Sequence, residues 1–135
     1  MVEKLLLVDD EPNVLDALQR QLRHEYRIVT APDAEQAITI LRVMGPFAMI
    51  VSDCQMPGIN GIQFLALARK MAPDTVRIML TGNHDVHTAM QAVNNGEIYR
   101  FLTKPCATEA LQKSIKEAIE HYRLKVANKG LANKS

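Results

Sequence analysis

The stretch FAMIVSDCQMPG, residues 47–58, decides the fold and raises the first question about function. Its apolar run over residues 47–51 has the length and composition of a buried strand. The run leads through Ser52 to Asp53, and a carboxylate at the end of a buried strand is costly unless a partner compensates its charge. Asp53 could therefore be a loop cap, a metal ligand or a nucleophile.

Short apolar runs on either side of this stretch predict further strands, and residues at helical spacing separate them. The predicted strands cover residues 5–8, 28–29, 47–51, 76–80 and 98–102. The helices between them are marked by Pro12 as a first helical residue, by Asp33 as a cap and by Gly61 as a helix start. A fourth helix ends at residues 94–96, and a long last helix includes residues 111–126. This strict alternation predicts an α/β fold with a parallel sheet between two layers of helices.

Composition fits one ordinary domain. The chain has 135 residues, of which 47% are hydrophobic and 23% are charged. The net charge of +1 gives no reason to expect direct nucleic acid binding. Cys54 and Cys106 have no disulfide or zinc-site spacing, and no apolar run approaches the roughly 20 residues of a membrane span. We therefore expect a cytoplasmic protein with no membrane partner.

Polar residues collect where the predicted strands end. Because the carboxyl ends of parallel strands meet at one edge of an α/β sheet, chemistry is expected there. These residues are Asp9, Asp10 and Glu11 after the first strand, Asp53 after the third, Thr81 after the fourth and Lys104 after the fifth. Each alone could be a cap or a solvated loop residue. Capping does not explain the whole ordered set.

Acids this close together repel one another unless a cation lies among them. The absence of neighbouring His or Cys ligands favours a hard cation, and the small ligand set suits Mg2+ better than Ca2+, with Mn2+ as a substitute. Carboxylates that hold magnesium beside phosphate oxygens form a phosphoryl-transfer arrangement. Asp53 would then be the nucleophile, and Lys104 and Thr81 would serve the remaining phosphoryl oxygens.

Four motifs in this order closely resemble the receiver domain of two-component response regulators. They are LLLVDDEP at residues 5–12, MIVSDCQMPGINGIQFL at 49–65, RIMLTG at 77–82 and YRFLTKP at 99–105. The resemblance covers residues 4 to about 122. It implies a flavodoxin-like (βα)5 fold with sheet order 2-1-3-4-5. We expect a receiver domain over residues 1–122, followed by a C-terminal helix extension or linker over residues 123–135.

The resemblance also assigns roles to individual residues. It makes Asp53 the phosphoacceptor and Thr81 and Lys104 the phosphoryl-binding residues. The metal ligands that it implies are Asp9, Asp10, Asp53 and the backbone carbonyl of Gln55. It implies that Thr81 and Phe101 act in switching. The loop-shaping residues that it implies are Pro57, Gly58 and Pro105. It also implies that Gln55 and Asn83 tune dephosphorylation.

The function implied is signal reception. A sensor histidine kinase or phosphotransfer protein would phosphorylate Asp53 with Mg2+, and the surface of the fourth helix, fifth strand and fifth helix, residues 84–122, would respond. The chain would not be an enzyme beyond accepting and losing its own phosphoryl group. AVNNGEIYRFLTKPC, residues 92–106, resembles receivers joined to HD-GYP or other cyclic-di-nucleotide output domains. We expect such an output, if there is one, C-terminal to this chain, and a homodimer is conceivable.

Two other classes of function stay open at this point. A phosphatase of the haloacid-dehalogenase type would need a second acid two residues after its nucleophile, where Gln55 stands. A nucleotide- or flavin-binding module can share the same fold, but the sequence contains neither G-x-G-x-x-G nor a P-loop. Turnover of a phosphomonoester would favour the first class, and copurifying flavin would favour the second.

Overall fold

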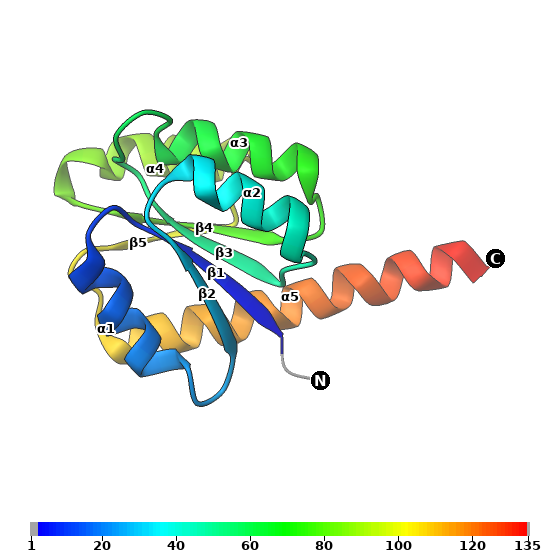
Figure 1. The fold of residues 1–135 in the computed structure, drawn as a ribbon. Helices are drawn as coiled ribbons and strands as arrows, with labels where there is room; N and C mark the ends of the chain where they lie inside the picture. The colour runs from blue at the N-terminus through cyan, green and yellow to red at the C-terminus, as the bar shows by residue number, and fades with distance from the viewer. Residues whose placement is uncertain (1–2, 135) are drawn as a thin grey trace.

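The computed structural model describes residues 3–134, and only the backbone is described for Asn83 and residues 130–134. Strands and helices alternate along this part of the chain (Figure 1). The strands are β1 (Lys4–Val8), β2 (Arg27–Ala31), β3 (Met49–Asp53), β4 (Val76–Thr81) and β5 (Arg100–Thr103). The helices are α1 (Pro12–Leu22), α2 (Ala34–Met44), α3 (Gly61–Met71), α4 (Val86–Asn94) and α5 (Thr108–Lys134), with a 3-10 turn, η1 (Asn83–Asp85), before α4.

The five strands form one parallel sheet in the order β2-β1-β3-β4-β5, which confirms the predicted topology. Helices α2, α3 and α4 cover one face, and α1 and α5 cover the other (Figure 1). Leu6 and Val8 pack with the first group, whereas Leu5 and Leu7 pack with the second. Because both faces of β1 are buried, its residues form an unbroken apolar run instead of an alternating one.

Two predicted strands begin too early. Strand β3 covers Met49–Asp53 and not residues 47–51, because its pairing with β1 starts at Met49 opposite Leu5. Strand β5 covers Arg100–Thr103 and not residues 98–102, because its pairing with β4 starts at Arg100. The apolar residues just before each strand lie outside the assigned strands, although the backbones of Ala48 and Tyr99 already hydrogen-bond to the neighbouring strands. The correction makes Asp53 the last residue of β3 instead of the residue after a strand.

Local signals fix where the helices begin. Pro12 is the first residue of α1, and Asp33 caps α2 by accepting a hydrogen bond from the backbone N–H of Gln36 at 2.8 Å. Helix α3 starts with a capping box, in which Asn60 and Gln63 each bond to the other's backbone N–H. These starts follow the carboxyl ends of the strands, so they place loops and helix N-termini around one edge of the sheet.

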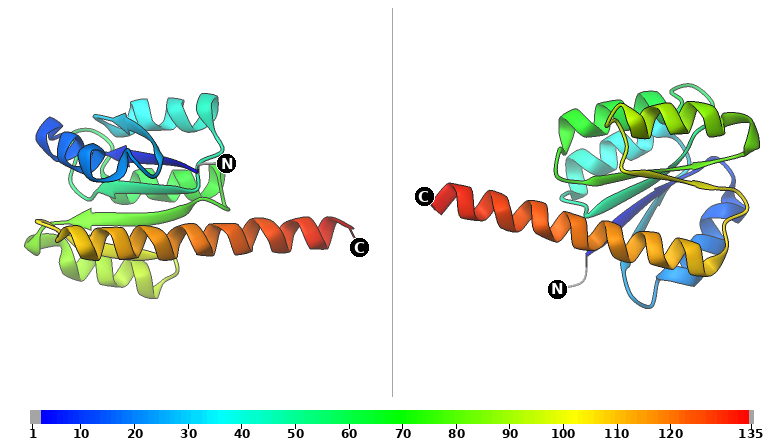
Figure 2. Two further views of the ribbon diagram at one scale, coloured as in Figure 1. Left: turned by 90° about the horizontal axis from the view of Figure 1, so that it is seen from below. Right: turned by 180° about the vertical axis from the view of Figure 1, so that it is seen from behind.

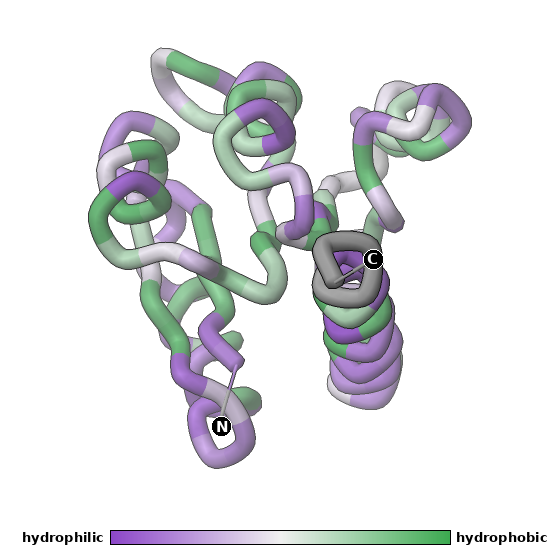
Figure 3. The backbone as a smooth tube through the Cα atoms, turned by 90° about the vertical axis from the view of Figure 1, so that its right-hand side faces the viewer, coloured by the Kyte–Doolittle hydropathy of each residue, from purple (hydrophilic) through white to green (hydrophobic). Residues whose placement is uncertain are grey.

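Helix α5 runs without a break through the predicted boundary at residue 122. Its first turns bury Leu111 and Ile115 against the sheet, and its last turns extend past the body of the domain (Figure 2). Arg123 and Lys129 pair with acidic residues of the body, and the turns carry both hydrophobic and hydrophilic residues (Figure 3). Within residues 3–134, no helix is both long and apolar enough to cross a membrane.

Candidate functional site

The carboxyl edge of the sheet brings together the acids that the sequence placed at strand ends. Carboxylate oxygens of Asp9, Asp10, Glu11 and Asp53 lie within 4.8 Å of one another. Asp9 and Asp53 are buried, whereas Asp10 and Glu11 are exposed. One ammonium group, that of Lys104, lies among them. The edge therefore concentrates more negative than positive charge at the end of a buried strand.

Asp9 is the most deeply buried acid, with 1% of its surface exposed. Its backbone N–H donates to the carbonyl of Ala31, and its Oδ1 accepts from the backbone N–H of Glu11 at 2.9 Å. Its Oδ2 lies 2.8 Å from Lys104 Nζ but accepts no hydrogen bond of suitable geometry. This oxygen is a buried acceptor with ligand capacity to spare.

Lys104 bridges the two buried acids from the loop after β5. Its Nζ lies 3.2 Å from Asp53 Oδ1, 2.8 Å from Asp9 Oδ2 and 3.6 Å from Glu11 Oε1. Burial alone would lower the pKa of Lys104, but its contacts with Asp9 and Asp53 outweigh burial and raise it. Lys104 is therefore held as a cation beside the strand end.

Asp53 lies in an environment that resists its negative charge. Burial raises the pKa of its carboxyl group, and the charge of Asp9 raises it further. Lys104 and the backbone N–H of Gln55 offset only part of this effect. A carboxylate in this position is stabilised by added positive charge, which is what a bound cation would bring.

Other predicted residues lie around this core of the site. Thr81 is the last residue of β4, is fully buried and donates its hydroxyl hydrogen to the carbonyl of Gly82 at 3.2 Å. Phe101 is half-buried in β5 and packs against the core on the α4 side. Asn83 begins η1, and the tuning role predicted for its side chain lies outside the described residues. Gln55 is exposed in the loop after β3.

The predicted loop-shaping residues have distinctive backbones. Gly58 has a φ of 76°, in the left-handed region that favours glycine, within the loop that joins β3 to α3. Pro57 precedes it. The peptide bond between Lys104 and Pro105 is cis. The loop after β3 therefore contains a left-handed position that glycine fills.

Two residues near the site were not assigned a role from the sequence. Gly61 donates its backbone N–H to the carbonyl of Cys54 at 2.9 Å, and a Cβ at Gly61 would lie 1.9 Å from the Asp53 carbonyl oxygen. Asp85 accepts a hydrogen bond from Gln55 at 3.1 Å. A glycine at the start of α3 hinted only at a helix terminus, and no local pattern links residues 55 and 85.

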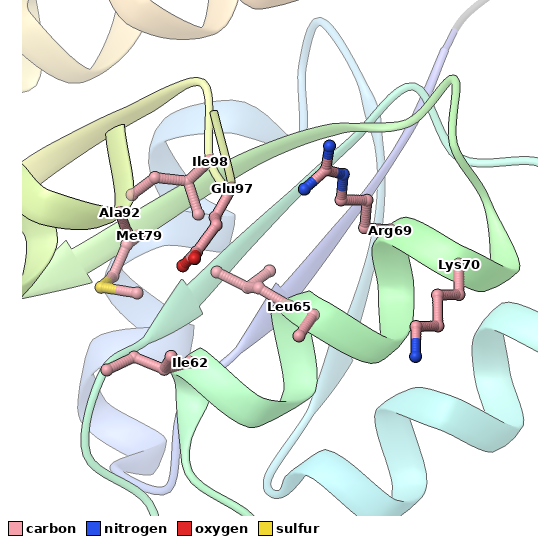
Figure 4. A pocket seen from close by; sticks show the side chains of 9 residues that line it. Ile62, Leu65, Arg69, Lys70, Met79, Ala92, Glu97 and Ile98 are labelled. Atoms are coloured by element: carbon pink, nitrogen blue, oxygen red, sulfur yellow. The ribbon is translucent and has the colours of Figure 1, made fainter. Parts of the chain in front are cut away.

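A different hollow lies on the α3 and α4 side of the sheet. Its volume is about 390 Å³, and Leu65, Met79 and Ile98 contribute to its apolar lining (Figure 4). None of the four clustered acids lines it. The acids singled out from the sequence therefore lie at the strand edge and not in this hollow.

The acidic edge has the donor set of a site for a hard divalent cation. All four clustered ligands offer oxygen, and carboxylate oxygens are the ligands that Mg2+ and Mn2+ prefer. The spare capacity of the buried Asp9 Oδ2 and the resistance of Asp53 to its own charge both fit such a cation. The residues present thus fit the metal that the sequence implied.

Comparison with known proteins agrees with this geometry. The family model for the response regulator receiver domain matches residues 5–116. The hydrogenase transcriptional regulatory protein HoxA of Cupriavidus necator is 35% identical over 116 residues, which are 86% of this chain and 24% of that protein. The chain spans about a quarter of the length of the curated relatives it matches.

Solved structures show the same architecture. The crystal structure of an adenylate cyclase from Rhodopirellula baltica matches with a TM-score of 0.96 and 36% identity, covering 100% of both chains. The signal receiver domain of an HD domain-containing protein from Pseudomonas fluorescens Pf-5 matches with a TM-score of 0.84 and 34% identity. That match covers 91% of this chain and 98% of the other.

Proposed function

The chain belongs to the response regulator receiver domain family of two-component systems, and on this premise we propose that Asp53 is its phosphoacceptor. One observation carries the assignment. Asp53 is a buried carboxylate at the end of β3 that touches Lys104 and lies within the cluster of Asp9, Asp10 and Glu11. A carboxylate that only capped a loop would need neither the lysine nor the other acids.

The proposed reaction is transfer of a phosphoryl group to this carboxylate. An Asp53 oxygen forms a bond to phosphorus, the bond from phosphorus to the donor's histidine nitrogen breaks, and the nitrogen keeps the electron pair. Lys104, which already contacts Asp53, binds one phosphoryl oxygen. Thr81 binds another when its hydroxyl leaves the Gly82 carbonyl. These contacts place positive charge and a donor where negative charge gathers.

Metal binding belongs to the same proposal. Asp9, Asp10, Asp53 and the backbone carbonyl of Gln55 would hold Mg2+, and Mn2+ could take its place. When bound, the metal neutralises negative charge on the acids and on the phosphoryl oxygens. The buried Oδ2 of Asp9 supports this assignment because a carboxylate oxygen that contacts one ammonium group keeps a further lone pair for a metal.

The response is proposed to pass through Thr81 and Phe101 to the surface of α4, β5 and α5. Phosphorylation adds about −1.5 to −2 charges, and movement of Thr81 would leave space for the half-buried Phe101 to turn inward. The partners are a histidine kinase or phosphotransfer protein, with a C-terminal output domain or a second copy as further candidates. Beyond exchange of its own phosphoryl group we propose no enzyme activity, and the two unpaired cysteines suit a cytoplasmic location.

A labelling experiment tests the function. Incubation with acetyl phosphate and MgCl2 should add one phosphoryl group, detected by intact-protein mass, and peptide mapping should place it within residues 47–58. Hydroxylamine should remove it, as expected of an acyl phosphate, and EDTA added beforehand should prevent labelling. Labelling of another peptide would contradict the assignment to Asp53. Sustained turnover of p-nitrophenyl phosphate would instead favour a phosphatase.

Metal binding should stabilise the fold. A ligand that binds only the native state adds about 2.7 kcal/mol at a concentration one hundred times its Kd, so MgCl2 should raise the Tm above that in NaCl of equal ionic strength. Asp9→Asn should lose most of this rise because it removes a carboxylate from the cluster. Asp16→Asn is the matched control, since Asp16 is an exposed acid of α1 outside the cluster. Equal responses in both variants would show that the acidic edge does not bind the metal.

A further inference from the structure

A side-chain hydrogen bond joins the segments that follow β3 and β4. Gln55 Nε2 donates to Asp85 Oδ1 at 3.1 Å. Gln55 stands two residues after Asp53 in the loop after β3, and Asp85 stands four residues after Thr81, at the end of η1. The bond therefore joins the loops that follow the two strands carrying the proposed phosphoacceptor and its threonine.

The carboxylate of Asp85 does not cap the helix that follows it. Asp85 occupies the N-cap position of α4, but its side chain makes no capping hydrogen bond. Asp33 and Asn60, at the same position of α2 and α3, both cap their helices. Burial raises the pKa of Cys54 to about 11, and the negative charge of Asp85 contributes to this rise. Cys54 directly follows Asp53 in the chain. The Asp85 side chain thus bonds to the loop after β3 instead of capping its own helix.

The chemistry of this pair fixes the orientation of the amide. An ionised carboxylate only accepts hydrogen bonds, so the amide of Gln55 must present its NH2 group to Asp85. The carbonyl oxygen of the amide is then the end left free. A carbonyl oxygen can accept a hydrogen bond from water, whereas an amide NH2 group cannot.

We propose that Asp85 is a positioning residue that orients the Gln55 amide so that its carbonyl oxygen holds the water that hydrolyses the aspartyl phosphate. This inference rests on the proposed function of Asp53. In that step the water oxygen forms a bond to phosphorus and the bond from phosphorus to the Asp53 oxygen breaks. The carboxylate leaves with the electron pair, the water gives up a proton to solvent, and inorganic phosphate is released.

The lifetime of the phosphoryl group tests the inference. The protein is labelled with acetyl phosphate and Mg2+, the donor is removed, and loss of the label is followed by intact-protein mass. Gln55→Ala and Asp85→Ala should each slow the loss about fivefold, the effect expected of one hydrogen bond. The double variant should be no slower than either single variant, because both changes remove the same interaction. Asp85→Asn keeps an acceptor oxygen and should stay within about twofold of the unmodified protein.

A second measurement needs no phosphate. In the unphosphorylated protein, the side-chain amide NMR signals of Gln55 should shift in Asp85→Ala and stay in place in His84→Ala, a change to the exposed neighbouring residue of the same turn. This inference alone would be overturned if Asp85→Ala lost its label at the rate of the unmodified protein. It would also be overturned if the effects of the two single variants on that rate multiplied in the double variant. A protein that takes up no phosphate would overturn the proposed function and this inference with it.

Discussion

Asp53→Asn should abolish phosphorylation and, in the absence of divalent metal, raise the melting temperature. The amide has nearly the shape of the carboxyl group but cannot act as the nucleophile, so no label should form. The gain in stability follows from the environment of the unmodified side chain. Burial and the charge of Asp9 resist the ionised form of Asp53 more than Lys104 favours it, which is why the pKa is raised. A neutral amide escapes that penalty.

The raised pKa of Asp53 determines how the difference in Tm between Asp53→Asn and the unmodified protein depends on pH. Because the pKa of Asp53 is higher in the folded than in the unfolded protein, the folded state holds the proton more tightly. The contribution of Asp53 to stability is complete below the unfolded pKa and is lost as pH rises through the folded pKa. Asp53→Asn should therefore exceed the unmodified protein in Tm at neutral pH, and the gap should close under acidic conditions.

Thermal unfolding in EDTA across a pH series measures this difference, and intact-protein mass after acetyl phosphate treatment measures labelling. Asp16→Asn again serves as the control, since it removes one exposed acid and leaves the cluster intact. It should keep both the labelling and the pH profile of the unmodified protein. A label that persists in Asp53→Asn, or a lower Tm at neutral pH, would contradict the role or the environment assigned to Asp53.

The fold and the central site residues were predictable because both follow from local patterns. The buried run of β1 and the capped start of α2 each carry their signal within a few neighbouring residues. Alternation of such elements leaves few parallel topologies, and a parallel sheet gathers its strand ends at one edge. That is why Asp9, Asp53 and Lys104 could be placed together before any distance was known.

The remaining features depend on contacts between distant parts of the chain. The two-residue error in β3 arose because strand pairing, and not apolarity, decides where a strand begins. The bond from Gln55 to Asp85 spans 30 positions, and neither residue belongs to a periodic pattern in the sequence. The tight approach of Gly61 to the backbone of Asp53 is likewise invisible until the loop between them is folded.

Similar receivers occur in a protein named as a transcriptional regulator, in one named as an adenylate cyclase and in one named as an HD domain-containing protein. The chemistry proposed for this chain lies at the acidic edge of the sheet. Helix α5 carries the chain away from the body of the domain (Figure 2).

Gly61→Ala should damage both stability and phosphorylation, although Gly61 has no side chain to contribute. A Cβ at this position would lie 1.9 Å from the carbonyl oxygen of Asp53 and 2.9 Å from its carbonyl carbon. Both are backbone atoms at the end of a central strand, so no side chain can rotate away to relieve the contact. The start of α3 or the end of β3 must move, and the hydrogen bond from Gly61 to the Cys54 carbonyl must stretch. Overpacking of this kind costs about 3 kcal/mol.

Such a loss should lower the Tm by about 10 °C, and displacement of the Asp53 backbone should slow labelling by acetyl phosphate even at temperatures where the variant is folded. Gly82→Ala is the matched control, because a Cβ there meets no atom within 4 Å and its φ of −81° suits any residue. Its Tm should match or slightly exceed that of the unmodified protein. Equal Tm values for the two variants would show that the close approach of Gly61 to Asp53 is not needed. A large loss of Tm confined to Gly61→Ala would instead mean that the fold depends on the close packing of the start of α3 against the end of β3.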